Sequence, residues 1–159
     1  KAGFQIMGDW AKGEFTAAGK VPGVDYYCAA TPSNNGYLYN VDSFIFYKSS
    51  DPDKQAGQKL LAKLMMGKNF QKVFNLYKGS IPARLDVSMD EFDKCAKTSN
   101  ADIKTAGASG GLVPSFAHGM AQGNTMKAAL QDIITEHFNS DMSSVDAANA
   151  LADSVLANM

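Results

Sequence analysis

The side chains best suited to chemistry stand in one short segment, residues 78–84, which reads Lys-Gly-Ser-Ile-Pro-Ala-Arg. Its glycine can take the left-handed conformation that commonly ends a helix, and its proline keeps the preceding residue extended. We therefore expect a loop that brings together the ammonium of Lys78, the hydroxyl of Ser80 and the guanidinium of Arg84. These groups could hold an oxygen-rich ligand. Taken alone, the two cations are better explained as solvated charges at a helix end.

Further hydrogen-bonding side chains stand in irregular segments beside predicted elements: Trp10, Asn40, Asp42 and His118. A carboxylate and an ammonium can each bond neighbouring hydroxyls with charge-assisted strength, while an indole covers the apolar face of a pyranose. Each residue also has a structural explanation. Trp10 can be a packed aromatic at a helix start, Asp42 can bond backbone amides, and His118 can cap a helix. As a set, these residues favour recognition of a sugar.

The alternative to sugar binding is an enzyme. A hydrolytic triad can be drawn from Ser80, His118 and Asp42, but the sequence has no Gly-x-Ser-x-Gly elbow to expose a nucleophile between a strand and a helix. A small sugar-processing hydrolase domain could instead use Asp42, Glu14 or His118 as acid or base. We expect a binding protein rather than an enzyme and keep the hydrolase as the alternative hypothesis.

Metal and phosphate sites are not indicated by the sequence. The two histidines, His118 and His137, are far apart and no pair of closely spaced cysteines accompanies them. The glycine-rich run at residues 107–111 lacks the lysine and the preceding strand of a phosphate-binding loop. We therefore predict no cofactor and no metal ion.

The composition is that of a globular chain long enough for one domain, with 159 residues of which 45% are hydrophobic and 19% charged. The net charge of -1, with basic residues distributed throughout, gives no indication of nucleic-acid or anionic-membrane binding. No apolar run approaches the length of a membrane span. The chain does not begin with Met and a strand pattern starts within its first residues, so we expect a fragment of a longer chain.

Cys28 and Cys95 are the only cysteines, and neither belongs to a metal-binding spacing. In a cytosolic protein they would be two unremarkable thiols. In an exported protein they would be expected to pair, and closing a loop of that length could stabilise the fold by roughly 4 kcal/mol.

Hydrophobic periodicity and turn residues predict an α/β chain in which helices pack on a small mixed sheet. Strands are expected at residues 4–7, 25–30 and 37–47, with the apolar run at 44–47 covered on both faces. Helices are expected at residues 10–18, 52–66, 69–78, 90–98 and 125–139, and again after Ser143. The small, polar stretch at residues 99–111 is expected to be a mobile connection.

Caps and apolar stripes define the expected ends and faces of these helices. Asp9, Asp51 and Ser143 are the expected N-caps. The residues expected to face the core on the helices at 52–66 and after Ser143 are Ala56, Leu60, Leu64, Met65, Ala147, Leu151, Val155 and Leu156. A third functional hypothesis follows, an interaction domain whose exposed helix faces bind a partner protein, for which a large apolar patch on the last helix would be the sign.

Residues 5–11, 39–44, 78–84 and 117–121 resemble bacterial extracellular solute-binding proteins of family 1, and most closely the glucose or glucose/mannose-binding components of ABC sugar importers. The succession of Met-Gly-Asp-Trp and Gly-Ser-Ile-Pro is fairly specific for that family, and the similarity covers essentially the whole chain. Family members are considerably longer and have two α/β lobes joined by a hinge, with the sugar between them. The resemblance implies that residues 1–159 are the C-terminal portion of such a two-lobed periplasmic-binding-protein fold, helix-rich with a small mixed sheet.

The resemblance also implies roles for individual residues. The polar sugar ligands on this side of the cleft would be Asp42, Lys78 and His118. Trp10 is the candidate stacking aromatic. The other side of the cleft would come from upstream segments absent from this chain.

The same resemblance implies supporting residues, a cellular location and partners. Asn40 and Arg84 would lie next to the ligand residues and hold them in place without being among the sugar ligands themselves. Export to the periplasm is implied, with a signal peptide upstream, and this favours a disulfide between Cys28 and Cys95. The implied partners are a monosaccharide, expected to be glucose, the membrane permease of an ABC importer and the missing N-terminal part of the same protein.

Overall fold

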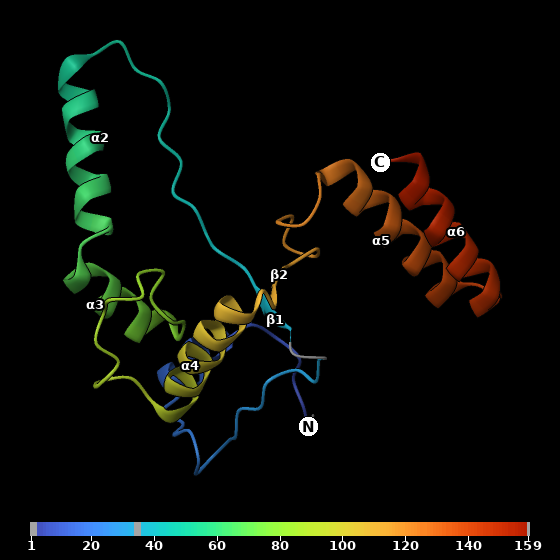
Figure 1. Cartoon of the computed structure of the whole chain (residues 1–159), viewed down its shortest axis with the longest axis horizontal. Coiled ribbons are helices and arrows are strands. Elements are labelled where there is room, and N and C mark those ends of the chain that lie inside the picture. The colour runs from blue at the N-terminus through green and yellow to red at the C-terminus, as the bar shows by residue number, and fades with distance from the viewer. Residues whose placement is uncertain (1–2, 34–35, 159) are drawn as a thin grey trace. The chain divides into compact units, whose positions relative to one another are not determined.

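The computed structural model describes residues 3–33 and 36–158 (Figure 1). The chain forms two compact units, which are described separately. The first unit comprises Lys1–Tyr37 and Val41–Gly111, and the second comprises Leu38–Asn40 and Leu112–Met159. Within the described ranges, no helix is both long and apolar enough to cross a membrane.

The described part of the first unit contains four helices: α1 (Ala11–Ala17), α2 (Pro52–Met65), α3 (Lys68–Lys78) and α4 (Lys94–Ser109). The start of α2 is as predicted, since the carboxylate of Asp51 accepts from the backbone amides of Asp53 and Lys54 at 2.9 and 3.3 Å. The predicted end of α3 is also confirmed, because Gly79 is left-handed with φ +87°.

The second unit contains two helices, α5 (Asn124–Asn139) and α6 (Ser144–Ala157), which lie side by side as the orange and red ribbons of Figure 1. Ser143 caps α6 as predicted: its hydroxyl accepts from the amide of Asp146 at 3.1 Å and donates to the carboxylate of Asp146 at 2.7 Å. The strand β2 (Leu112–Pro114) pairs in parallel with β1 (Tyr37–Tyr39). Ser115 extends this pairing by donating its amide to the carbonyl of Tyr39 at 2.8 Å.

Most of the predicted strands are wrong. Residues 4–7 and 25–30 form no strand, apart from one isolated bridge between Pro22 and Tyr26. The predicted strand at 37–47 is reduced to Tyr37–Tyr39, and the run at 44–47 is exposed rather than covered on two faces. A strand exists only where a second segment supplies the other half of its hydrogen bonds, and an apolar sequence pattern does not provide that segment.

The predicted mobile connection is also wrong, because α4 continues through residues 99–109. The helix begins later than predicted, with Asp93 as its N-cap accepting from the amide of Ala96 at 2.8 Å. Alanine, the strongest helix former, stands at positions 101, 106 and 108, and the hydroxyls of Thr105 and Ser109 find acceptors in backbone carbonyls one turn earlier, at 3.0 and 3.1 Å. Left-handed Gly110 ends the helix.

The cores of the two units are small. Buried apolar residues in the first unit are Met65, Val87, Phe92, Ala96 and Ala106, and those in the second are Met126 and Ala147. The predictions for Met65 and Ala147 are confirmed. Those for Leu60, Leu64 and Leu156 are wrong, because these side chains are 70%, 59% and 72% exposed. Their periodicity is helical as expected, but no neighbouring element in their unit covers them.

Candidate functional site

The end of α3 brings two of the predicted ligand residues together. The ammonium of Lys78, in the last turn of α3, forms an ion pair with the carboxylate of Asp42, which lies in the extended segment ahead of α2. The Asp42 side chain is 63% exposed. An ammonium offers three N–H donors and a carboxylate offers two acceptor oxygens, so the pair has the chemistry that binds neighbouring hydroxyls.

An aromatic surface adjoins this ion pair. Phe70, Val73, Phe74, Tyr77 and Lys78 line a groove of about 700 Å³ along α3. The rings of Phe70 and Phe74 stack with centroids 5.4 Å apart, and the ammonium of Lys78 lies 5.9 Å from the centroid of the Phe74 ring. Charged and aromatic groups are therefore close together on this surface.

Trp10 lies at the start of α1, where it occupies the N-cap position predicted for Asp9. A β-carbon placed on Gly8 would come within 2.1 Å of the Trp10 ring, so the indole fills the space beside that glycine. The prediction that Asp9 caps α1 is wrong. Its carboxylate instead accepts from the backbone amide of Ile81 at 3.0 Å, which ties the start of α1 to the loop after α3.

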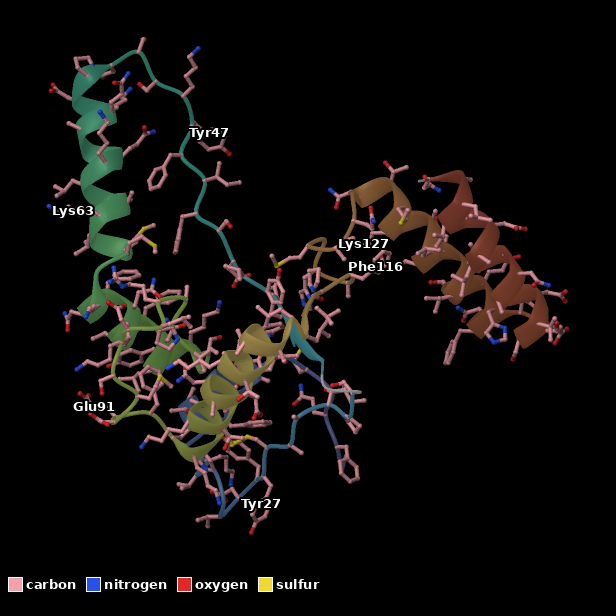
Figure 2. All side chains as sticks on the ribbon, in the orientation of Figure 1. Tyr27, Tyr47, Lys63, Glu91, Phe116 and Lys127 are labelled. Atoms are coloured by element: carbon pink, nitrogen blue, oxygen red, sulfur yellow. A yellow bond between two sulfur atoms is a disulfide. The ribbon has the colours of Figure 1, made fainter. Side chains whose placement is uncertain are left out.

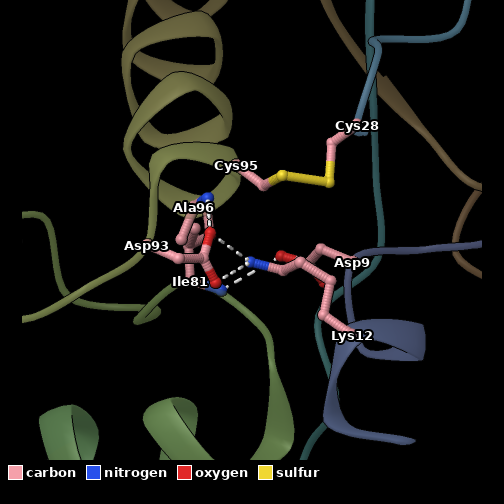
Figure 3. A network of polar contacts seen from close by, with 7 residues as sticks. All are labelled: Asp9, Lys12, Cys28, Ile81, Asp93, Cys95 and Ala96. Atoms are coloured by element: carbon pink, nitrogen blue, oxygen red, sulfur yellow. Dashed lines mark hydrogen bonds and ion pairs between the residues drawn. A yellow bond between two sulfur atoms is a disulfide. The ribbon is translucent and has the colours of Figure 1, made fainter. Parts of the chain in front are cut away.

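A second tie links α1 to α4, as Figure 3 shows. Lys12 is 5% exposed, and its ammonium donates to both carboxylate oxygens of Asp93 at 3.0 and 3.1 Å. Asp93 also caps α4, so one carboxylate serves both purposes. Sequence patterns gave no signal for this ion pair, because its two residues are 81 positions apart.

The disulfide between Cys28 and Cys95 is present, with the two α-carbons 5.7 Å apart. It fastens the segment after α1 to the first turn of α4, two residues beyond Asp93 (Figure 3). This confirms the pairing that the family resemblance implied.

Arg84 binds within its own loop. Its Nε and Nη2 donate to the two carboxylate oxygens of Asp86 at 2.8 and 2.7 Å, and its Nη1 donates to the carbonyl of Met66 at 3.1 Å. Lys68 lies 3.0 Å from the same carboxylate. The hydrogen bonds from Arg84, followed by that from Lys68, hold the pKa of Asp86 well below its usual range, and Asp86 raises the pKa of Arg84. Arg84 therefore fastens the loop to the end of α2, while Lys78 faces Asp42.

Ser80 does not present its hydroxyl as the sequence suggested. The residue is buried, and within the described ranges its Oγ has no hydrogen-bond partner. A serine nucleophile needs a base within hydrogen-bond distance. The geometry at Ser80 therefore gives no support to a hydrolytic triad.

His118 and Asn40 belong to the second unit, whereas the other predicted site residues belong to the first. The Nδ1 atom of His118 shares a 2.7 Å hydrogen bond with the hydroxyl of buried Ser115, which fixes the imidazole on its loop. His118 does not cap the following helix, since Gly123 is the N-cap of α5. That His118 and Asn40 join Lys78 around a ligand stays a prediction.

Buried amides behind the loop were missed by sequence reasoning. The side-chain oxygen of Gln71 accepts from the amide of Ala83 at 3.0 Å, and its Nε2 donates to the carbonyl of Met65 at 2.9 Å. Gln71 therefore joins the loop to the end of α2. Gln71 lies with Asn75 on a polar side of α3, and these are the residues that the helix buries, so the apolar pattern gave no signal for them. Among the residues that the structure describes, no cluster of side chains could hold a metal ion.

Comparison with protein-family models gives no match for this chain. The chain is 45% identical over 156 residues, or 98% of its length, to a probable sugar-binding periplasmic protein of Brucella suis, and 42% identical over the same length to one of Rhizobium meliloti. It is 36% identical over 137 residues to an uncharacterized ABC transporter extracellular-binding protein of Pyrococcus horikoshii. The chain spans only 37% of the first two relatives and 30% of the third. The periplasmic names of the first two support a periplasmic location for this chain.

Proposed function

We propose that this chain is part of a periplasmic solute-binding protein and that it contributes one side of a monosaccharide site for an ABC importer. The observation that carries the proposal is the Lys78–Asp42 ion pair, which lies beside the aromatic groove of α3. The pair supplies the donors and acceptors that hydroxyls need, and the rings supply an apolar platform. The names of the similar proteins support the same class of ligand.

Glucose is the monosaccharide we propose, on the strength of the family resemblance. In this proposal Asp42, Lys78 and His118 bond the sugar hydroxyls and Trp10 stacks on the ring. No reaction is performed on the sugar. It binds to one side, the protein closes over it by a hinge motion, and the closed form docks on a membrane permease.

Further polypeptide is needed to complete the site. The relatives are more than twice the length of this chain, and apolar residues on α2 and in the segment ahead of it are exposed. We propose that an N-terminal part of the same protein supplies the other side of the cleft and the partner that the hinge requires. This chain would then be the C-terminal portion.

The test is a glucose titration by calorimetry in a chimaera, in which this chain replaces the matching 156 residues of the Brucella suis relative. We expect Lys78→Ala to weaken glucose binding by at least about tenfold, since it removes a charged hydrogen-bond donor. His118→Ala should behave alike. The melting temperature should change little, because the Lys78–Asp42 pair is partly exposed.

The matched control is Lys63→Ala, which removes an exposed lysine on α2 and should leave the affinity unchanged. Equal affinity in the Lys78, His118 and Lys63 variants would remove the first two residues from the site. Binding of another hexose in place of glucose would correct the ligand but keep the class. Release of product from a glycoside would favour the hydrolase alternative with Glu14, Asp42 or His118.

A further inference from the structure

Two glycines allow α1 to touch the end of α3. A β-carbon on Gly13 would lie 2.7 Å from the carbonyl oxygen of Lys78, and one on Gly79 would lie 2.5 Å from the amide nitrogen of Gly13. Both clashes are with backbone atoms, which cannot rotate away as the end of a side chain can. Gly79 is also left-handed, a conformation that costs other residues free energy. Only glycine at both positions allows this approach.

This contact lies between two predicted ligand residues. The amide of Gly13 donates to the carbonyl of Trp10 at 3.0 Å, so the position of Gly13 fixes the backbone of Trp10. Gly79 directly follows Lys78, whose own carbonyl opposes Gly13. A displacement of α1 at this point therefore moves the indole relative to the ammonium.

Two neighbouring bonds also hold the start of α1 in place. Asp9 accepts from Ile81 beyond the end of α3, and Lys12 pairs with Asp93 at the start of α4 (Figure 3). We refer to Asp9, Lys12, Gly13, Gly79, Ile81 and Asp93 together as the junction. All six lie in the first unit, so its geometry belongs to one compact body.

We propose that Gly13 and Gly79 are positioning residues of the sugar site, whose backbone contact sets the place of Trp10 relative to Lys78. The proposal rests on the proposed function for its effect on the ligand. A site that binds a small ligand must hold its groups to a fraction of an ångström, which a direct backbone contact does better than long side chains. Neither glycine touches the sugar in this scheme.

The chain provides a matched control in Gly57. It lies inside α2, as Gly13 lies inside α1, but apart from its chain neighbours and the adjacent backbone of its own helix no described atom lies within 4 Å of where its β-carbon would be. Alanine in an open helical position is tolerated or stabilising. Gly13→Ala and Gly57→Ala therefore introduce the same methyl group into two helices and differ only in what that group meets.

The experiment has two readouts. The first is the emission maximum and acrylamide quenching of Trp10, the only tryptophan of the 159-residue chain. Gly13→Ala should shift the emission and change the quenching, whereas Gly57→Ala should leave both as in the parent. The second readout is glucose affinity in the chimaera. We expect Gly13→Ala to weaken it by about tenfold and Gly57→Ala to leave it unchanged.

Asp9 provides a variant without a steric clash, in case Gly13→Ala unfolds. Asp9→Ala removes the acceptor for the Ile81 amide and should change Trp10 emission and glucose affinity in the same direction, while Asp9→Asn, which keeps an acceptor oxygen, should restore most of both. Unchanged Trp10 emission in Gly13→Ala and Asp9→Ala would overturn the positioning role. Failure of the parent chimaera to bind glucose would count against the proposed ligand alone, since the Trp10 measurement does not require one.

Discussion

The junction and α2 belong to the same unit but are held in place by different means. At the junction, the backbones of Gly13 and Gly79 touch, and the Lys12–Asp93 ion pair is largely buried. On α2, Met65 is buried, but Leu60 and Leu64 are mostly exposed, and so are apolar side chains of the segment before it, such as Tyr47 (Figure 2). The junction is complete within this chain, whereas Leu60 and Leu64 are not covered by their own unit.

The two regions differ in whether both partners of a contact belong to this chain. At the junction, each hydrogen bond and each close backbone contact has both of its partners in the first unit, so no further polypeptide is needed to form it. An exposed apolar face lowers its free energy only when another surface covers it. We therefore expect changes at the junction to affect this chain directly, and changes on the outer face of α2 to be nearly silent in it.

Breaking the disulfide tests the junction most severely. Reduction, or Cys28→Ser with Cys95→Ser, should destabilise the chain by about 4 kcal/mol, because the bridge closes a long loop next to the Lys12–Asp93 pair. Chemical denaturation with and without dithiothreitol measures this. The double-serine variant with added dithiothreitol is the control for effects of the reagent itself. If reduction did not change the denaturation midpoint, the hydrogen bonds, the ion pair and the backbone contact of the junction would be sufficient for its stability without the disulfide.

Two neighbouring residues of α2 sharpen the contrast further. Met65 is 7% exposed and Leu64 is 59% exposed. Met65→Ala should cost about 2–5 kcal/mol, since it leaves a cavity in the core, while Leu64→Ala should change the stability by less than about 0.5 kcal/mol. Urea denaturation of both variants decides this. Similar losses at the two positions would show that Leu64 is covered in solution.

The smallest effect concerns an exposed group of charges at the C-terminal end of α2. Hydrogen bonds from Arg84 and then Lys68 depress the pKa of Asp86, so the stability they provide is present above the ordinary Asp value of 3.8 and is lost as the pH falls toward the folded pKa. Arg84→Gln should raise the pKa of Asp86 toward its usual value. An NMR titration of the Asp86 carboxyl measures its pKa in the parent protein and in the Arg84→Gln variant.

Because Asp86 is exposed, added salt should weaken its attraction to Arg84, whereas the attraction between Lys12 and Asp93, in which the lysine is buried, should be screened less. A parent protein whose Asp86 titrates at its ordinary value would refute the described hydrogen bonds from Arg84.

Prediction from the sequence succeeded where one short segment contains all the information. Asp51 followed by Pro52, Gly79 after Lys78, and Ser143 with Asp146 mark helix ends through groups only a few residues apart. The pairing of Cys28 with Cys95 was reached only through the family resemblance, because two cysteines alone do not reveal whether they meet.

Prediction failed where a distant partner decides the outcome. The strands at 4–7, 25–30 and 40–47 have suitable residues but no segment beside them to complete their hydrogen bonds. Residues 99–109 could have formed a loop or a helix, and the helical outcome was not evident from their small side chains.

The sequence by itself determined the start of α2, the end of α3 and the start of α6, together with the residue types suited to a sugar. The tertiary structure alone decided that Asp9 bonds Ile81, that Lys12 pairs with Asp93, and that Gly13 lies against Gly79. The physical reason is distance along the chain: the two hydrogen-bonded pairs join residues 72 and 81 positions apart. Local energetics determine a helix, but only the folded chain determines which helices meet.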